Sequence, residues 1–144
     1  CAIKNNNHIS DLLSIKYWVI IGCKYYNCKN LTSIHIPDSV TSLGNNVFSD
    51  CEKLTSIHIP DSVTSIGDGA FSGCKSLTSI HISDSVTSIG KSAFWCCKNL
   101  TSIHIPDSVT SIEKSAFYGC PLKDSIKQKL ISRFGVQIIF QFLW

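Results

Sequence analysis

The sequence lacks the features that mark membrane-spanning and nucleic-acid-binding proteins. No run of about 18 apolar residues occurs, so we expect no transmembrane segment. Charged residues make up only 16% of the chain, and the net charge of +3 comes from scattered lysines. Positive charge is concentrated only at 123–133, whereas nucleic-acid binding needs a basic face or stripe. We therefore expect no nucleic-acid partner.

Methionine is absent, and the first residue is Cys1. We expect either that a leader has been removed, as at the mature end of a bacterial lipoprotein, or that the sequence is a fragment of a longer protein. The fragment is the simpler interpretation. In both cases a targeting segment would be missing, so its absence says nothing about location.

Enzyme signatures are missing as well. There is no Gly-x-Ser-x-Gly motif and no glycine-rich phosphate loop. Serine, histidine and aspartate recur, but only as parts of a repeated surface, where nothing shields them from water or builds an oxyanion hole. We expect no enzymatic activity, no catalytic residue and no cofactor.

Internal repetition is the dominant feature of the sequence. Four segments that begin with Leu-Thr-Ser-Ile-His-Ile align without a gap, 23 residues apart; they are 31–53, 54–76, 77–99 and 100–120. Tyr25 and Cys28 fall on the Phe and Cys positions of this unit. A degenerate first repeat therefore extends from about residue 12 to about residue 30. We divide the chain into a repeat region, 1–120, and a C-terminal cap, 121–144.

Each unit predicts two short strands. Ile34 and Ile36 alternate with polar residues, as in a β-strand with one buried face. Pro37 ends this strand because proline has no N–H to donate to a sheet, and 40–43 resembles a second extended stretch. The apolar side chains of one unit do not offset the entropy of ordering it, so the units must stack into one continuous core.

The rest of the unit predicts turns. Gly44 fits a turn that needs a positive φ. The segment 45–51 fits a single tight helical turn that places Phe48 inside.

The segment after Cys120 predicts a helix that covers the open end of the last repeat. Asp124 is the candidate N-cap, apolar residues follow at helical spacing, and Gly135 is a stop signal. The final apolar segment, 136–144, is expected to pack against this cap as a strand, or to mark the point where a longer chain was cut.

The pattern Leu-x-x-Ile-x-Ile, which begins at Leu31, resembles the signature of leucine-rich repeats. The fuller unit, LTSIxIPDSVTSIGxxAFxxC, is similar to the BspA-like, treponemal-type branch of that family over about residues 12–120. Serine replaces the usual Asn or Cys after the strand, at Ser39 and its counterparts. Ser83 and Glu113 also depart from the chain's own pattern, which concerns local turn geometry and not the fold.

This resemblance implies a β-rich solenoid with short parallel strands, tight helical turns and a C-terminal capping helix. Proteins of this branch are typically surface-associated and bind extracellular matrix proteins, host cells or other microbes. The resemblance therefore implies a cell-surface or extracellular location, while the residues leave a cytoplasmic one open. It carries over no binding residue position by position.

Histidine and serine form outward columns on the first strand of the unit. Each histidine lies between two inward isoleucines and so points outward, and neighbouring parallel strands lie about 4.7–4.9 Å apart. The columns are His35, His58, His81 and His104, and Ser33, Ser56, Ser79 and Ser102. A histidine ladder suits a metal site or a pH switch; the simpler interpretation, which we prefer, is that duplication copied one surface residue. In either case this face is where we expect a partner to bind.

Two further columns have simple structural interpretations. One is an aspartate column that follows the strand, made of Asp38, Asp61, Asp84 and Asp107. We expect these side chains to hydrogen-bond to the backbone of the turn. We prefer this to a calcium site, because the glycine-rich turns of calcium-binding repeats are absent. Cys28, Cys51, Cys74, Cys97 and Cys120 are expected to be reduced and buried, because stacked side chains point in parallel, which disfavours disulfides. Cys1, Cys23 and Cys96 fall outside this column, so the redox compartment stays undecided.

The sequence supports two hypotheses on function. The first is a binding module whose strand face docks a protein, such as an extracellular matrix or cell-surface protein, or a glycan. The second is a structural spacer or self-assembling rod without a specific ligand. Unpaired strand edges at the solenoid ends could recruit another copy, and the apolar residues that could serve that contact are Phe140, Phe142, Leu143 and Trp144.

Overall fold

The computed structural model describes residues 27–136 and 138. The part of the expected first repeat before residue 27, and the segment 139–144, lie outside the described residues. One four-stranded sheet has the order β1-β3-β5-β7, and a second has the order β2-β4-β6-β8. The first contains β1 (Ser33–His35), β3 (Ser56–His58), β5 (Ser79–His81) and β7 (Ser102–His104). The second contains β2 (Ser42–Leu43), β4 (Ser65–Ile66), β6 (Ser88–Ile89) and β8 (Ser111–Ile112).

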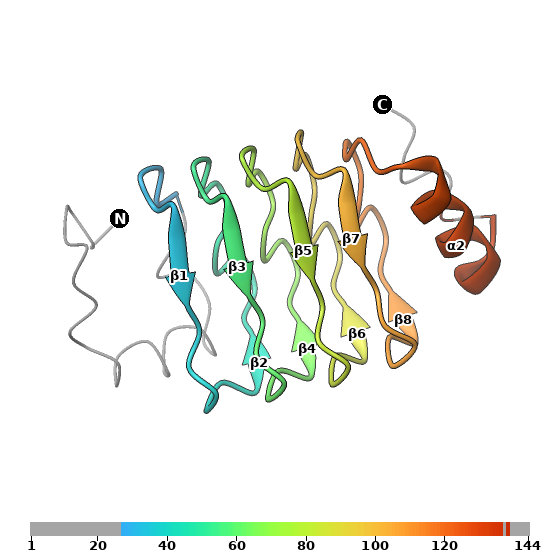
Figure 1. The fold of residues 1–144 in the computed structure, drawn as a ribbon, viewed down its shortest axis with the longest axis horizontal. Helices are drawn as coiled ribbons and strands as arrows, with labels where there is room; N and C mark the ends of the chain where they lie inside the picture. The colour runs from blue at the N-terminus through green and yellow to red at the C-terminus, as the bar shows by residue number, and fades with distance from the viewer. Residues whose placement is uncertain (1–26, 137, 139–144) are drawn as a thin grey trace.

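Both sheets are parallel, and each residue pairs with its counterpart in the next repeat. Ser33 pairs with Ser56 in the first sheet, and Ser42 pairs with Ser65 in the second. The repeats therefore stack along one axis as successive turns of a solenoid, with α2 (Asp124–Phe134) at the C-terminal end (Figure 1). This confirms the predicted parallel-strand solenoid with its 23-residue spacing and C-terminal helix.

A backbone turn connects the two strands of each repeat. The N–H of Val40 donates to the carbonyl of Pro37 over 3.0 Å, and Val86 makes the same bond to Ser83 over 3.1 Å. The hydroxyl of Ser83 also donates to the carbonyl of Pro60 in the repeat below, over 3.3 Å. The replacement of proline by serine in the repeat 77–99 therefore leaves the turn unchanged.

The third side of the solenoid consists of consecutive turns. The N–H groups of Asn46 and Phe48 donate to the carbonyls of Asp68 and Ala70 in the next repeat, both over 2.8 Å. The alternate N–H groups close turns within the repeat instead, such as Ser49 to Asn46 over 3.1 Å. Because half of the donors bond to a neighbouring repeat, this segment is a ladder of turns rather than the continuous helical turn that we expected. Phe48 is buried, as predicted.

The expected positive φ at Gly44 is wrong. Positive φ occurs instead at Asn46 (55°) and Asp50 (56°) and at their counterparts in later repeats. Glycine at the Gly44 position serves a close approach between repeats, because a Cβ on Gly67 would lie 2.7 Å from the carbonyl oxygen of Leu43.

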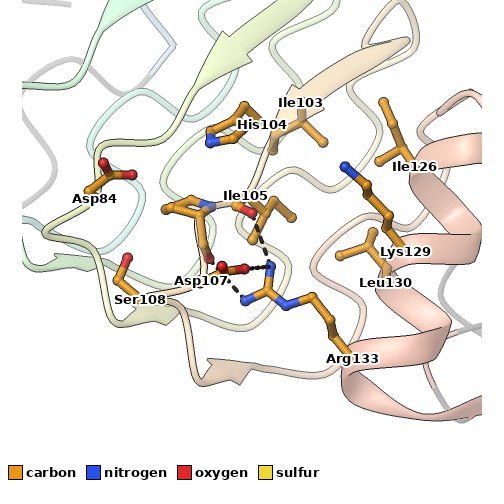
Figure 2. A pocket seen from close by; sticks show the side chains of 11 residues that line it. Asp84, Ile103, His104, Ile105, Asp107, Ser108, Ile126, Lys129, Leu130 and Arg133 are labelled. Atoms are coloured by element: carbon orange, nitrogen blue, oxygen red, sulfur yellow. Dashed lines mark hydrogen bonds and ion pairs between the residues drawn. The ribbon is translucent and has the colours of Figure 1, made fainter.

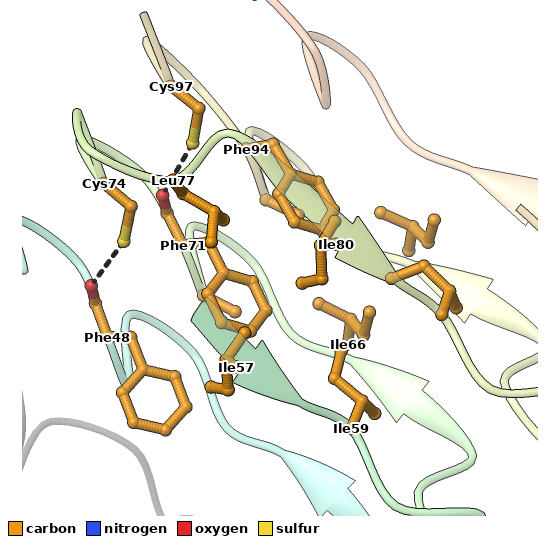
Figure 3. Close-up of a cluster of buried hydrophobic side chains, with 14 of the residues drawn as sticks. Phe48, Ile57, Ile59, Ile66, Phe71, Cys74, Leu77, Ile80, Phe94 and Cys97 are labelled. Atoms are coloured by element: carbon orange, nitrogen blue, oxygen red, sulfur yellow. Dashed lines mark hydrogen bonds between the residues drawn. The ribbon is translucent and has the colours of Figure 1, made fainter. Parts of the chain in front are cut away.

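A column of stacked phenylalanine rings runs through the core (Figure 3). The ring centroids are 5.5 Å apart from Phe48 to Phe71, 5.2 Å from Phe71 to Phe94, and 5.5 Å from Phe94 to Phe117. All four side chains are fully buried. Each ring packs against its own counterparts, so the core continues from one repeat to the next without a boundary.

The cysteine column lies beside these rings. The thiols of Cys74 and Cys97 donate to the carbonyls of Phe48 and Phe71 over 3.2 and 3.1 Å (Figure 3). Burial raises the pKa of Cys51 to about 11 and raises that of Cys74 further. The column from Cys51 onward is reduced and buried, as predicted.

The prediction was wrong for Cys28, which is disulfide-bonded. Cys28 stands at the first described rung of the column.

Helix α2 begins at Asp124, and the N-cap residue is Lys123, which makes no side-chain capping bond. The expectation that Asp124 is the N-cap was therefore wrong; its carboxylate lies in the first turn and contacts Lys127 at 3.6 Å. The helix ends before Gly135, whose positive φ of 86° agrees with the predicted stop. Leu130 is buried, so the apolar side of α2 covers the end of the core. None of the helices in the described part is long and apolar enough to cross a membrane.

We expect Phe71→Ala to destabilise the whole solenoid. Loss of a fully buried ring leaves a cavity in the middle of the column and should lower the free energy of unfolding by about 3–5 kcal/mol. Urea unfolding followed by circular dichroism measures this change. Thr64→Ala, at an exposed position of the same repeat, is the control, and equal midpoints for the two variants would contradict the proposed role of the column.

We expect Cys96 to be the first of the described thiols to react with a thiol reagent. Cys96 is only partly buried, whereas Cys51, Cys74 and Cys97 are buried, and burial keeps their thiols protonated and unreactive. Peptide mapping after brief alkylation of the native protein measures the order. Equal labelling of Cys74 and Cys96 without denaturant would show that the core opens readily.

Candidate functional site

The outward side of the first sheet forms a polar surface, which we call the strand face. Each of its strands has a central buried isoleucine between outward serine and histidine side chains, as in β3, where Ser56 and His58 are exposed and Ile57 is buried. All predicted site residues lie on this face, and all are exposed except Ser102, which is half-buried. Parallel register brings them together in two columns.

The histidine column is in register over its whole length. His35 pairs with His58, His58 with His81, and His81 with His104. The rings of His81 and His104 stack with centroids 5.0 Å apart and planes 10° apart. Within the part of the chain that the structure describes, no group of three or more His, Cys, Asp or Glu side chains is placed to hold a metal ion.

The aspartate column forms the edge of the strand face where the strands end. Asp38, Asp61 and Asp84 are exposed, and among residues 27–136 their carboxylates make no hydrogen bond. The backbone alone closes the turn, so the expected capping of the turn by Asp was wrong. Asp107 differs from the others because its carboxylate lies 4.0 Å from the guanidinium of Arg133.

Lysines line the opposite edge, where the strands begin. We call this line the basic edge; its members are Lys29, Lys53, Lys75, Lys98 and Lys123, all exposed. Glu52 lies among them and pairs with Lys75 at 3.0 Å. Lys29, Lys75 and Lys98 share one position of the repeat, which Glu52 occupies between them, and Lys53 and Lys123 follow that position by one and two residues. The sequence could have revealed the basic edge, because most of these lysines directly follow the periodic cysteine or come one position later.

The strand face ends in a hollow of about 600 Å³ between the last repeat and α2 (Figure 2). His104 and Asp107 line it from the repeat, and Lys129 and Leu130 line it from the helix. The ammonium group of Lys129 is directed toward the side of the hollow that holds His104 (Figure 2). A sequence alone does not reveal this hollow, because it depends on the angle at which α2 meets the last repeat.

Arg133 connects the helix to the open end of the solenoid. Its guanidinium donates to the carbonyls of Ile105 (3.0 Å), Pro106 (2.9 Å) and Val109 (2.9 Å). In earlier repeats the next repeat covers this region; for example, Ser83 donates to Pro60. One side chain therefore supplies donors that a further repeat would otherwise provide.

These features define a leucine-rich-repeat solenoid with a helical cap. A profile of the BspA type leucine rich repeat region matches residues 19–141 as six copies. The chain belongs to the BspA-type leucine-rich-repeat family.

Solved structures show the same architecture. A leucine-rich repeat protein from Bacteroides ovatus is 32% identical with a TM-score of 0.57, over 72% of this chain and 34% of that chain. This chain thus spans about a third of that relative's length. The T. pallidum leucine-rich repeat protein TpLRR is 21% identical with a TM-score of 0.54, over 80% of this chain and 76% of that one.

The pneumococcal vaccine antigen PcpA is 24% identical with a TM-score of 0.52, over 62% of this chain and 22% of that one. At these identities TpLRR and PcpA show a shared fold. No curated protein matches the chain.

We expect Arg133→Ala to detach the cap. Three backbone carbonyls lose a charged donor, which should lower the free energy of unfolding by about 2–3 kcal/mol. Chemical denaturation measures this loss, and hydrogen exchange should show that it begins in the last repeat. Lys127→Ala, which removes the contact with Asp124 on the same helix, is the control. A variant with an unchanged unfolding midpoint would show that apolar packing of α2 suffices.

Proposed function

We propose that this protein is a non-catalytic binding module of the adhesion type, and that its strand face recognises a protein partner at a cell surface. The observation that carries this proposal is the array of outward serine and histidine side chains, repeated in register on four successive strands. An exposed polar array of this regularity presents the same donors and acceptors at every rung. It therefore suits a partner with an extended or repetitive surface.

The borders of the strand face support docking in a defined orientation. One edge carries the aspartate column and the other the basic edge, so a partner with complementary charges would bind in only one direction. The hollow beside α2 adds a recess at the end of an otherwise regular face. It could hold a single protruding side chain of the partner.

The family supports the surface location. BspA-type repeats give the fold, and PcpA, which shares that fold, is described as a vaccine antigen. A glycan is the alternative ligand for the same face, because hydroxyl and imidazole groups also hydrogen-bond to sugars.

The variant His58→Glu/His81→Glu tests the proposal. It places two carboxylates in the two central repeats of the strand face and should abolish capture of the partner from extracellular-matrix and cell-surface extracts. The protein should stay folded, because both side chains are exposed. The matched control is Thr64→Glu/Thr87→Glu, which adds the same charge at exposed positions beside the second sheet.

Capture by both variants would place the interface elsewhere on the molecule. If wild type captures nothing, the spacer or self-assembly hypothesis becomes the better one. Light scattering over a wide concentration range then separates these two roles, because only self-assembly raises the apparent mass.

A further inference from the structure

The third side of the solenoid carries an exposed aromatic residue that the repeats do not share. Trp95 is 42% exposed, and its ring stacks on Tyr118 with centroids 6.2 Å apart and planes 9° apart. The same column contains Ser49 and Ser72 in the earlier repeats. Because the four units are otherwise nearly identical, this replacement of serine by aromatic residues stands out as a local specialisation.

Register leaves one side of the Trp95 ring uncovered. The N–H of Gly73 donates to the carbonyl of Trp95 over 2.8 Å, which places Ser72 directly beside Trp95 in the stack. Tyr118 covers the ring from the following repeat, whereas Ser72 is too small to cover it from the preceding one. The side of the Trp95 ring that faces the Ser72 position is therefore a flat, accessible apolar surface.

The basic edge runs past this aromatic site. Lys98 follows Trp95 by three residues, and Lys75 occupies the same column one repeat earlier. Burial raises the pKa of the Cys96 thiol, while the charges of Lys98 and Lys75 lower it. Both lysines therefore act electrostatically on the residue that directly follows Trp95.

We infer that the basic edge and Trp95 together bind an acidic, sulfated polysaccharide, which lies along the solenoid axis. Lys75 and Lys98 hold the same position in consecutive repeats and suit a linear polyanion that runs along the stack, and the exposed Trp95 ring offers a surface for the apolar side of a sugar ring. The basic edge borders the strand face, but this inference rests on the lysines and Trp95 and not on the serine and histidine columns of that face.

A polysaccharide fits this surface better than a nucleic acid does. The basic edge is one line of lysines without arginine, and it holds one accessible aromatic platform rather than a succession of them. Single-stranded nucleic acids bind through successive bases that stack on several aromatic side chains in a basic groove.

The test uses a size-defined heparin oligosaccharide and the same oligosaccharide after removal of its sulfates, with affinity measured at several salt concentrations. We expect salt-dependent binding to heparin and little binding to the desulfated form. Lys75→Gln/Lys98→Gln should weaken binding by about tenfold and reduce the slope against log salt by about 1.5. Trp95→Ser, which copies the natural residue of the second repeat, should weaken it by about fivefold.

Two further variants complete the test. Lys91→Gln/Lys114→Gln removes the same charge from exposed lysines outside the basic edge and should leave affinity nearly unchanged. Glu52→Gln removes the acid that pairs with Lys75 and should increase affinity.

Three results would overturn the inference. They are no binding to heparin, an equal loss for the two lysine double variants, and tighter binding of single-stranded RNA than of heparin. An unchanged affinity for Trp95→Ser would also contradict it, because the aromatic platform would then take no part.

Discussion

Hydrogen bonding between successive repeats is the constraint on which the rest of the structure depends. On the second side of the solenoid Thr64 donates its N–H to Thr41 over 2.9 Å, and on the third side Phe48 donates to Ala70 over 2.8 Å. Because these bonds and the parallel strand pairing hold successive repeats in register, any residue type that recurs every 23 residues becomes a column in space. The buried phenylalanines, the thiols and the histidines are each a result of this one rule.

Much of this could be predicted from the sequence, because it follows from local patterns. The alternation around Ile34 and Ile36 identifies the buried side of the first strand, and the period places every copy above the last. Those two facts suffice to put His58 and His81 outside, in one column on one face, and Phe48 inside. The predicted site residues therefore lie together on one face, and their role in binding stays a prediction.

The features that sequence analysis missed depend on contacts between repeats or with the cap. On the third side, the backbone N–H groups alternate between acceptors in their own repeat and acceptors in the next one. The segment 45–51, which we expected to be a helical turn, is therefore a ladder of turns. Gly67, the counterpart of Gly44, serves close packing against the preceding repeat rather than an unusual φ, a distinction that the pattern of a single repeat does not contain. The hollow beside α2 depends on how Arg133 orients the helix. We missed the basic edge because its lysines look scattered along the chain and come together only when the repeats are aligned.

The capping arrangement has a consequence for how such a protein can change in length. Each repeat presents the same surface to the next, and the guanidinium of Arg133 donates hydrogen bonds to three backbone carbonyls of the final repeat. Backbone carbonyls are the same whatever the side chains, so a unit could be gained or lost in the interior and the cap would meet the same acceptors. Unequal recombination within the repeated stretch of the gene would then generate proteins of different reach that still fold. The encoded solenoid could then change its length in steps of one whole repeat.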